Sequence, residues 1–357
     1  MPDSPQVVII GAGIIGASVA YHLQRDGAQV TVIEAMQAGG LATRHSWAWI
    51  NASWGNPEPY FRLRHRSMKL WRELSDDVPG LAVNWCGGLL WDAPATELEA
   101  YVAQHQGWGY EIRAVDGAEA MRLEPWLGAP PAFAVHVAEE GVIEPLVAAA
   151  GFLGAARDAG AAVVVGETVQ EIERQGSRVT GIVTDRRRIV ADHVVIAAGS
   201  MTAALAASID VTLPLSAPPG LLVTTTVQPK LLNGLVMAPE MHVRQMADGR
   251  LIAGADFGGS DPGADADKAA QDVVAGLRRF FGGRPEIKLE TYTIGHRPMP
   301  ADGFPAVGPA PGLKGLSIAV THSGITLAPV IGAALSGEIL TGAEEPLLAP
   351  YRPARFG

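Results

Sequence analysis

The chain opens with a change of hydrophobic period from strand to helix. Residues 7–10 form a short, wholly apolar run, as expected for a parallel strand covered on both faces. A glycine-rich turn follows at 11–16, and apolar residues then recur at helical spacing until Gly27, which is a typical stop. A second apolar run at 30–33 ends in Glu34. The pattern predicts a strand, a tight turn, a helix and a second strand with an acid at its end.

This order of elements is typical of a Rossmann-like dinucleotide site. Gly11 permits the tight turn, Gly13 lets a pyrophosphate approach the backbone, and Gly16 allows the helix to pack closely on the strand. Glu34 lies where a carboxylate reaches a ribose hydroxyl, which favours an adenosine ribose without a phosphate. The alternative, a tight turn with an unrelated surface glutamate, leaves the order of the elements unexplained.

Three later segments carry further patterns. Residues 194–199 predict a second buried strand that ends in small residues, although ordinary sheet packing gives the same pattern. Residues 295–308 place one arginine beside a proline within a turn-rich run. Residues 321–324 precede an expected amphipathic helix that ends near Gly342 and whose N-terminus offers unpaired amides.

Together these segments resemble the FAD-dependent D-amino-acid oxidase superfamily, in particular the branch of glycine oxidase, sarcosine oxidase and small D-amino-acid dehydrogenases. The resemblance runs almost end to end and rests on VVIIGAGIIGASVAYHL with Glu34, VVIAAG, GHRPMPADGFPAVG and THSGITLAPVIGAAL. It implies an α/β fold with a discontinuous Rossmann-like FAD-binding domain at 1–80, 141–213 and 297–357. A substrate domain of α+β type with a mixed sheet is expected at 81–140 and 214–296.

The resemblance also implies which residues contact FAD. The expected contacts are Gly11, Gly13, Ile14, Ile15, Gly16, Glu34, Ala35, Thr43, Arg44, His45, Ser46, Val169, Ala198, Gly199, Arg297, Ser323, Gly324, Ile325 and Thr326. The positive end of the last helix is expected to stabilise negative charge on the reduced flavin. A solvated loop would also explain Arg44 and His45, and a buried strand would explain Val169. We expect noncovalent FAD, because no cysteine lies near the C-terminal flavin loop and His45 is offset from the flavin-linked histidine of some relatives.

Two arginines are candidates for binding substrate. Arg297 matches the family arginine that commonly holds the substrate carboxylate, for which a planar guanidinium is suited. Its alternative role is a structural salt bridge to Asp302 or another acid. Arg244 lies on the family's hairpin beside the substrate cavity and is the second candidate. His322, in the flavin-side loop, is favoured over His296 as a catalytic residue that tunes protonation or orients the flavin.

Trp47 and Trp49 form the most distinctive local feature. If this segment is extended, two tryptophans two residues apart share a face. They could wall a substrate pocket and attract a cationic group through cation–π contacts. Core packing against the flavin domain is an equally good explanation.

Composition narrows the function classes further. Acidic residues outnumber basic ones by 37 to 27, so nucleic acid is not an expected partner. Cys86 is the only cysteine, which excludes an intramolecular disulfide framework and a multi-cysteine zinc site, and no metal is predicted. The start of the chain lacks a basic signal-like region, and no uninterrupted apolar span occurs elsewhere, so we expect a cytoplasmic protein.

These observations predict an FAD-dependent oxidation of the C–N bond of an amino acid or N-alkyl amino acid. A hydride would pass from the α carbon to flavin N5, giving an imine, with oxygen or another electron acceptor reoxidising the flavin. One alternative is a flavin-binding subunit of a heteromeric amine or amino-acid dehydrogenase complex. Another is a dehydrogenase that uses only nicotinamide. The sequence leaves open a homo-oligomer and a heteromeric dehydrogenase partner.

Overall fold

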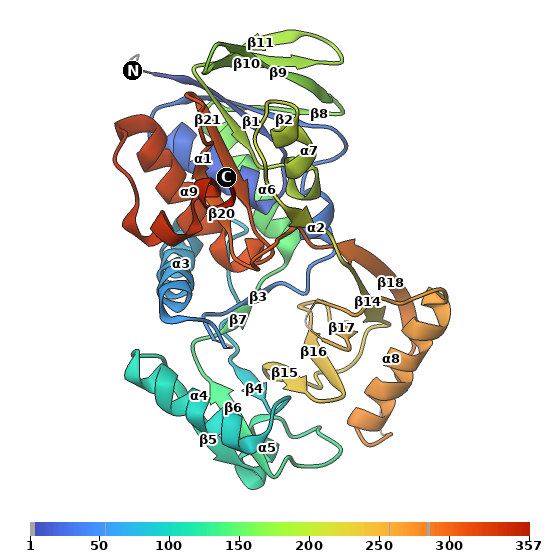
Figure 1. Cartoon of the computed structure of the whole chain (residues 1–357). Coiled ribbons are helices and arrows are strands. Elements are labelled where there is room, and N and C mark those ends of the chain that lie inside the picture. Colours follow the sequence, from blue (N-terminus) through green and yellow to red (C-terminus); the bar gives the residue numbers. More distant parts are fainter. Residues whose placement is uncertain (1–3, 54, 257, 284–285) are drawn as a thin grey trace.

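The computed structural model describes residues 4–53, 55–256, 258–283 and 286–357. Figure 1 shows two lobes, each built on a large sheet. The first sheet has six strands in the order β20-β21-β12-β1-β2-β8, all parallel except β20. Its strands are β1 (Gln6–Ile10), β2 (Gln29–Glu34), β8 (Ala162–Val165), β12 (His193–Ile196), β20 (Ala306–Pro309) and β21 (Leu316–Val320).

The position of β1 between two cores explains why residues 7–10 are all apolar. Val7 and Ile9 belong to the core that includes the helices of this lobe, whereas Val8 and Ile10 belong to the core beneath a three-stranded sheet. The three-stranded sheet contains β9 (Val169–Gln175), β10 (Arg178–Thr184) and β11 (Arg188–Val190). The helices are α1 (Ile14–Arg25), α2 (Leu41–Arg44), α3 (Glu58–Asp77), α6 (Pro145–Asp158), α7 (Thr202–Ala207) and α9 (Gly324–Thr341).

The second lobe is built on an eight-stranded mixed sheet, in the order β18-β14-β17-β16-β15-β4-β6-β5. Its strands are β4 (Gly88–Leu90), β5 (Ile112–Asp116), β6 (Phe133–Val137), β14 (Pro219–Thr225), β15 (Leu235–Ala238), β16 (Met241–Gln245), β17 (Leu251–Gly254) and β18 (Leu289–His296). Two distant chain segments join at the parallel pair β15–β4. Helices α4 (Ala95–Gly107), α5 (Gly117–Leu123) and α8 (Ala266–Phe280) complete the lobe (Figure 1). The predicted mixed α/β fold class is confirmed.

Two short strand pairs complete the sheet structure. β3 (Trp49–Ile50) pairs with β7 (Gly141–Val142), and β13 (Leu215–Ser216) pairs with β19 (Met299–Pro300). In Figure 1, β3 and β7 lie where the upper lobe meets the lower one. Trp49 therefore sits in a strand at the junction of the two lobes.

Helix α9 differs from the expected amphipathic helix, because it is buried on most of its surface. It packs against α1 and α3, so apolar residues are favoured around its circumference. It ends at Gly342, as predicted, in a left-handed conformation with φ +76°. By length and composition α9 alone among the described helices could cross a membrane, but 67% of this span is buried inside the protein.

Gly332 lets α9 approach α1 closely. A Cβ atom added there would lie 2.4 Å from Ser18 Oγ and 2.8 Å from the Ser18 carbonyl oxygen. We expect Gly332→Ala to lower the free energy of unfolding by about 1–3 kcal/mol, because the space between α9 and α1 is already filled. Gly337→Ala in the same helix is the matched control, since a Cβ there meets nothing within 4 Å.

The control substitution should be neutral or stabilising by up to about 1 kcal/mol, because alanine favours a helix interior. Urea unfolding of the two variants measures the difference. Equal stabilities would show that the α1–α9 contact is not tightly packed.

Candidate active site

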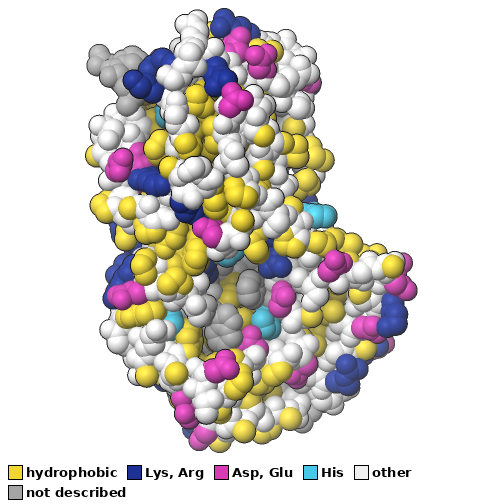
Figure 2. All heavy atoms as spheres, in the orientation of Figure 1, with side chains coloured by type: hydrophobic (Ala, Val, Ile, Leu, Met, Phe, Trp, Pro, Cys, Tyr) yellow, Lys and Arg dark blue, Asp and Glu magenta, His cyan; other side chains and the backbone are white. Residues whose placement is uncertain are grey.

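A cavity of about 520 Å³ lies at the carboxyl ends of β1, β2, β12 and β21. Ligands of open α/β sheets bind at this edge, where strand order reverses around the first strand. The cavity continues from the glycine turn to the start of α9, and residues of both lobes line it. The face shown in Figure 2 is hollowed where the two lobes meet.

The first end of the cavity contains the glycine turn. Gly11 has φ +107°, and a Cβ there would lie 2.4 Å from the Ala197 carbonyl oxygen. A Cβ at Gly16 would lie 2.0 Å from the Gly11 carbonyl oxygen. Gly11 therefore serves the turn and Gly16 serves helix packing, as the sequence pattern predicts. Gly16 itself does not line the cavity, whereas Gly11 and Gly13 do.

Two side chains hold this turn in place. The Ile14 amide donates to Thr43 Oγ1 at 3.0 Å. Glu34 accepts from the Ala12 amide at 2.9 Å and from the Met36 amide at 3.0 Å. Each carboxylate oxygen of Glu34 thus has one backbone donor and keeps further acceptor capacity for a ligand hydroxyl. Val169 lines the same end of the cavity.

Arg297 lies in the wall at the opposite end. Its Nε is buried without a hydrogen-bond partner, and no acid in the described ranges forms an ion pair with it. Asp302, its suggested structural partner, instead pairs with Arg355 at 2.6 Å. A Cβ at Gly258 would lie 1.7 Å from Arg297 Nη1, so the guanidinium rests directly on a glycine. The structure therefore contradicts a salt bridge between Arg297 and Asp302.

Arg64 also lines the cavity, and our sequence reasoning missed it. Its Nε donates to the Asn51 carbonyl oxygen at 3.0 Å, its Nη1 donates to Ser323 Oγ at 2.7 Å, and its Nη2 donates to Asn51 Oδ1. Arg64 is buried on the apolar side of α3, four residues from both Tyr60 and Met68. A basic residue at an apolar helical position is the signal that could have revealed it.

His322 lies near both arginines. Burial lowers its pKa to about 4, and the charges of Arg64 and Arg297 act in the same direction. Its Nδ1 lies 3.1 Å from Ser323 Oγ. His322 is therefore a neutral imidazole at neutral pH and adds no third positive charge to this end of the cavity.

Trp47 and Trp49 both line the cavity, and the two rings meet edge to face with centroids 6.2 Å apart. The segment is not extended as considered from sequence, because Ala48 has φ +62°. The Trp47 indole donates to the Ile252 carbonyl oxygen at 3.1 Å. The two rings thus wall the cavity and also belong to the core.

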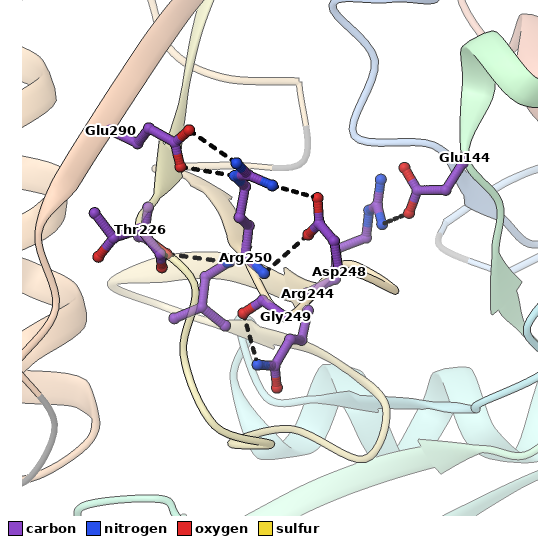
Figure 3. A network of polar contacts seen from close by, with 10 residues as sticks. Glu144, Thr226, Arg244, Asp248, Gly249, Arg250 and Glu290 are labelled. Carbon is purple, nitrogen blue, oxygen red and sulfur yellow. Dashed lines mark hydrogen bonds and ion pairs between the residues drawn. The ribbon is translucent and has the colours of Figure 1, made fainter.

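Arg244 is not among the residues that line the cavity, contrary to expectation. It is fully buried, and its Nη1 forms an ion pair with Glu144 Oε1 at 3.2 Å (Figure 3). Its Nε donates to the Trp47 carbonyl oxygen. Since its donors are already used behind the cavity wall, Arg244 supports Trp47 rather than facing a substrate. Arg44 is likewise absent from the lining, although Thr43, His45 and Ser46 belong to it.

The family described as FAD dependent oxidoreductase matches residues 6–337. The chain belongs to this family. It is 27% identical to a glycine oxidase of Pseudomonas aeruginosa, over 98% of this chain and 99% of the relative. It is also 27% identical to the hydrogen cyanide synthase subunit HcnC of the same organism, over 98% and 96%. The crystal structure of L-proline dehydrogenase from P. horikoshii has a TM-score of 0.89 at 23% identity and covers 100% and 98% of the two chains.

The cofactor of this family is FAD, and the cavity fits it. The turn at Gly11 and Gly13 leaves the amide end of α1 open to a pyrophosphate, and Glu34 faces the same space. The expected FAD contacts that line the cavity are Gly11, Gly13, Ile14, Ile15, Glu34, Ala35, Thr43, His45, Ser46, Val169, Ala198, Gly199, Arg297, Ser323, Gly324, Ile325 and Thr326. Within the described ranges, no group of three or more His, Cys, Asp or Glu residues could hold a metal ion.

The lack of space for a Cβ atom at Gly11 predicts that a substitution there weakens FAD binding. We expect Gly11→Ala to weaken FAD binding by about tenfold or more, because the added methyl group displaces the turn from Ala197. Gly27→Ala is the matched control, since Gly27 has a similar φ of +103° but open space around its Cβ position. FAD affinity is measured by fluorescence titration of the FAD-free protein. The prediction fails if both variants bind FAD equally well.

The environment of His322 predicts an unusually acidic imidazolium. Titration by NMR of histidine-labelled protein should give a midpoint at about 4 for His322, because desolvation and the charges of Arg64 and Arg297 disfavour the protonated ring. The resonance is assigned by its absence in His322→Gln. A midpoint at the ordinary pKa of about 6.5 would contradict the described burial.

Proposed function

We propose that this FAD-dependent oxidoreductase oxidises the C–N bond of an amino acid or N-alkyl amino acid to an imine, with hydride transfer from the α carbon to flavin N5. The observation that carries this proposal is the unpaired Arg297 at the end of the cavity opposite Glu34. Arg297 is half-buried, its Nε is buried without a hydrogen-bond partner, and no described acid pairs with it, so it is suited to bind an anionic group of a ligand. A carboxylate fits its planar guanidinium in a bidentate pair.

Each part of the cavity has a role in this reaction. Bound FAD supplies the hydride acceptor. Arg297 orients the substrate by its carboxylate, and Trp47 and Trp49 exclude water from the wall beside it. Arg64 and the N-terminus of α9 place positive charge at the same end, where they stabilise negative charge that develops during reduction.

The named relatives support an amino-acid substrate. One relative is a glycine oxidase, and one similar crystal structure is that of an L-proline dehydrogenase. One named substrate is a primary amine and the other is a cyclic secondary amine, and both carry a carboxylate on the α carbon. The feature they share is the one that Arg297 is suited to bind.

A second candidate function is a flavin-binding subunit of a heteromeric amine or amino-acid dehydrogenase. It is supported by the similarity to HcnC, which is named as a subunit. Activity of the purified chain separates the two proposals. Turnover without any added protein supports an independent enzyme, and inactivity until a partner is added supports the subunit.

A substrate panel tests the leading proposal. The FAD-loaded protein is incubated with amino acids, N-alkyl amino acids and the matching amines without a carboxylate, while peroxide formation and dye reduction are followed separately. We expect turnover of carboxylated substrates. Peroxide would identify oxygen as the acceptor, and dye reduction alone would indicate a dehydrogenase. Equal turnover of the amines without a carboxylate would contradict the proposal.

The proposed pair between Arg297 and the substrate carboxylate predicts a selective effect of Arg297→Gln. We expect kcat/KM for the best amino acid to fall about 100-fold or more, since removing one partner of a charge pair that the bound substrate would desolvate costs about 2–5 kcal/mol. Gly258→Ala should also lower kcat/KM, because the added methyl group would displace the Arg297 guanidinium.

Arg355→Gln is the matched control for the loss of a nearby arginine. It breaks the pair with Asp302 but leaves the cavity lining intact, so kcat/KM should change less than about threefold. If Arg297→Gln affects carboxylated and uncarboxylated amines alike, Arg297 does not hold a carboxylate.

A further inference from the structure

A buried acid, Glu140, lies directly behind the cavity wall. Its Oε1 accepts hydrogen bonds from the Tyr110 hydroxyl at 2.8 Å and from Ser53 Oγ, and its Oε2 accepts from Trp49 Nε1 at 2.9 Å. All three donors are uncharged. Ser53 and Trp49 line the cavity, whereas Tyr110 and Glu140 do not. The carboxyl is thus one side chain away from the space where a substrate binds.

The surroundings of Glu140 set the pKa of its carboxyl near neutral pH. Burial raises its pKa to about 7, against the opposing effect of its three donors and of Arg64 on α3. Tyr110, before β5, is kept protonated because burial and Glu140 raise its pKa well above the usual value. The adjacent Glu139 pairs with His65 at 3.3 Å and so belongs to a different contact.

The acids that line the cavity and His322 are less suited than Glu140 to the role of proton acceptor. Glu34 and Glu167 line the cavity at the nucleotide end, where Glu167 also pairs with Arg187 at 3.1 Å. His322 has a pKa of about 4 and is a weak proton acceptor. An amino acid, however, arrives at neutral pH with a protonated amine, and that nitrogen needs a lone pair before the α hydride can leave.

We propose that Ser53 and Glu140 take the proton from the ammonium group of the bound substrate. The inference rests on the proposed amine oxidation. An N–H bond of the ammonium breaks as Ser53 Oγ accepts its proton, and the original hydroxyl proton of Ser53 passes to Glu140 Oε1. The substrate becomes a neutral amine, the carboxylate becomes a carboxylic acid, and the serine is unchanged. Trp49 fixes Oε2, which leaves Oε1 directed to Ser53.

The test is the pH dependence of kcat/KM for an amino acid. In the unaltered protein, kcat/KM should fall as the pH drops below about 7, because the protonated carboxyl can no longer accept a proton. Glu140→Gln should lose this inflection. Its kcat/KM should rise about tenfold per pH unit up to the pKa of the substrate amine, since only the neutral amine then reacts.

Two further variants separate this role from a structural one. Ser53→Ala keeps the carboxyl but removes the hydroxyl that connects it to the cavity, so it should give the same profile as Glu140→Gln. The Tyr110 hydroxyl lies outside the cavity, and its hydrogen bond lowers the pKa of Glu140. Tyr110→Phe removes this bond, so the inflection should remain and should move to higher pH. Above the pKa of the substrate amine, the rates of Glu140→Gln and the unaltered protein should converge.

The outcomes distinguish this inference from the proposed function. If the unaltered protein oxidises amino acids and both Glu140→Gln and Ser53→Ala keep its inflection near pH 7, the proton transfer is wrong and the proposed function stands. If the unaltered protein oxidises no amino acid, the proposed function itself fails. Should Glu140→Gln not fold, the profile of Ser53→Ala decides the question.

Discussion

The site depends on the fixed position of the first turn of α9. Pro329 has no amide hydrogen, so the Ile325 carbonyl oxygen lacks its usual helical donor, and Trp71 Nε1 of α3 donates to it at 3.0 Å. Thr326 Oγ1 donates to the Trp49 carbonyl oxygen at 3.1 Å. These contacts tie the helix to α3 and β3, and the close packing at Gly332 ties it to α1. The amide end of α9 therefore stays directed at the cavity.

This fixed helix gives the cavity two chemically different ends. Glu34 and the amides of the glycine turn face one end, which suits a ribose and a pyrophosphate. Arg64, Arg297 and the start of α9 make the other end positive, while His322 stays neutral. Under the proposed function, a carboxylated substrate would bind at the positive end, and Glu140, which lies behind the wall, would accept its proton. In the proposed function, this charge difference would orient both the cofactor and the substrate.

Features that depend on nearby residues were predictable from the sequence. The order of β1, the glycine turn, α1 and β2 with Glu34 follows from local hydrophobic period and turn chemistry, and so does the end of α9 at Gly342. The C-terminal motifs led to the family and its cofactor. They did not decide whether Arg297 formed a structural salt bridge, because that depends on Asp302 being engaged by Arg355.

Features that depend on distant contacts were missed or misplaced. Arg64 and Glu140 form hydrogen bonds with residues far away in the chain, Arg64 with Ser323 and Glu140 with Trp49. Arg244 lies on β16, and strand alternation alone does not reveal which face meets the cavity. The left-handed conformation of Ala48 has no local sequence signal, because alanine rarely adopts it.

The most direct test of hydride removal from the α carbon is anaerobic mixing of the FAD-loaded protein with an amino acid that the protein oxidises. The bleaching of flavin absorbance is compared for the ordinary substrate and for the same substrate with deuterium on the α carbon. We expect complete bleaching that is markedly slower with deuterium, because the α C–H bond breaks in that step. Bleaching at the same rate with both substrates in every measured phase would contradict hydride removal from the α carbon.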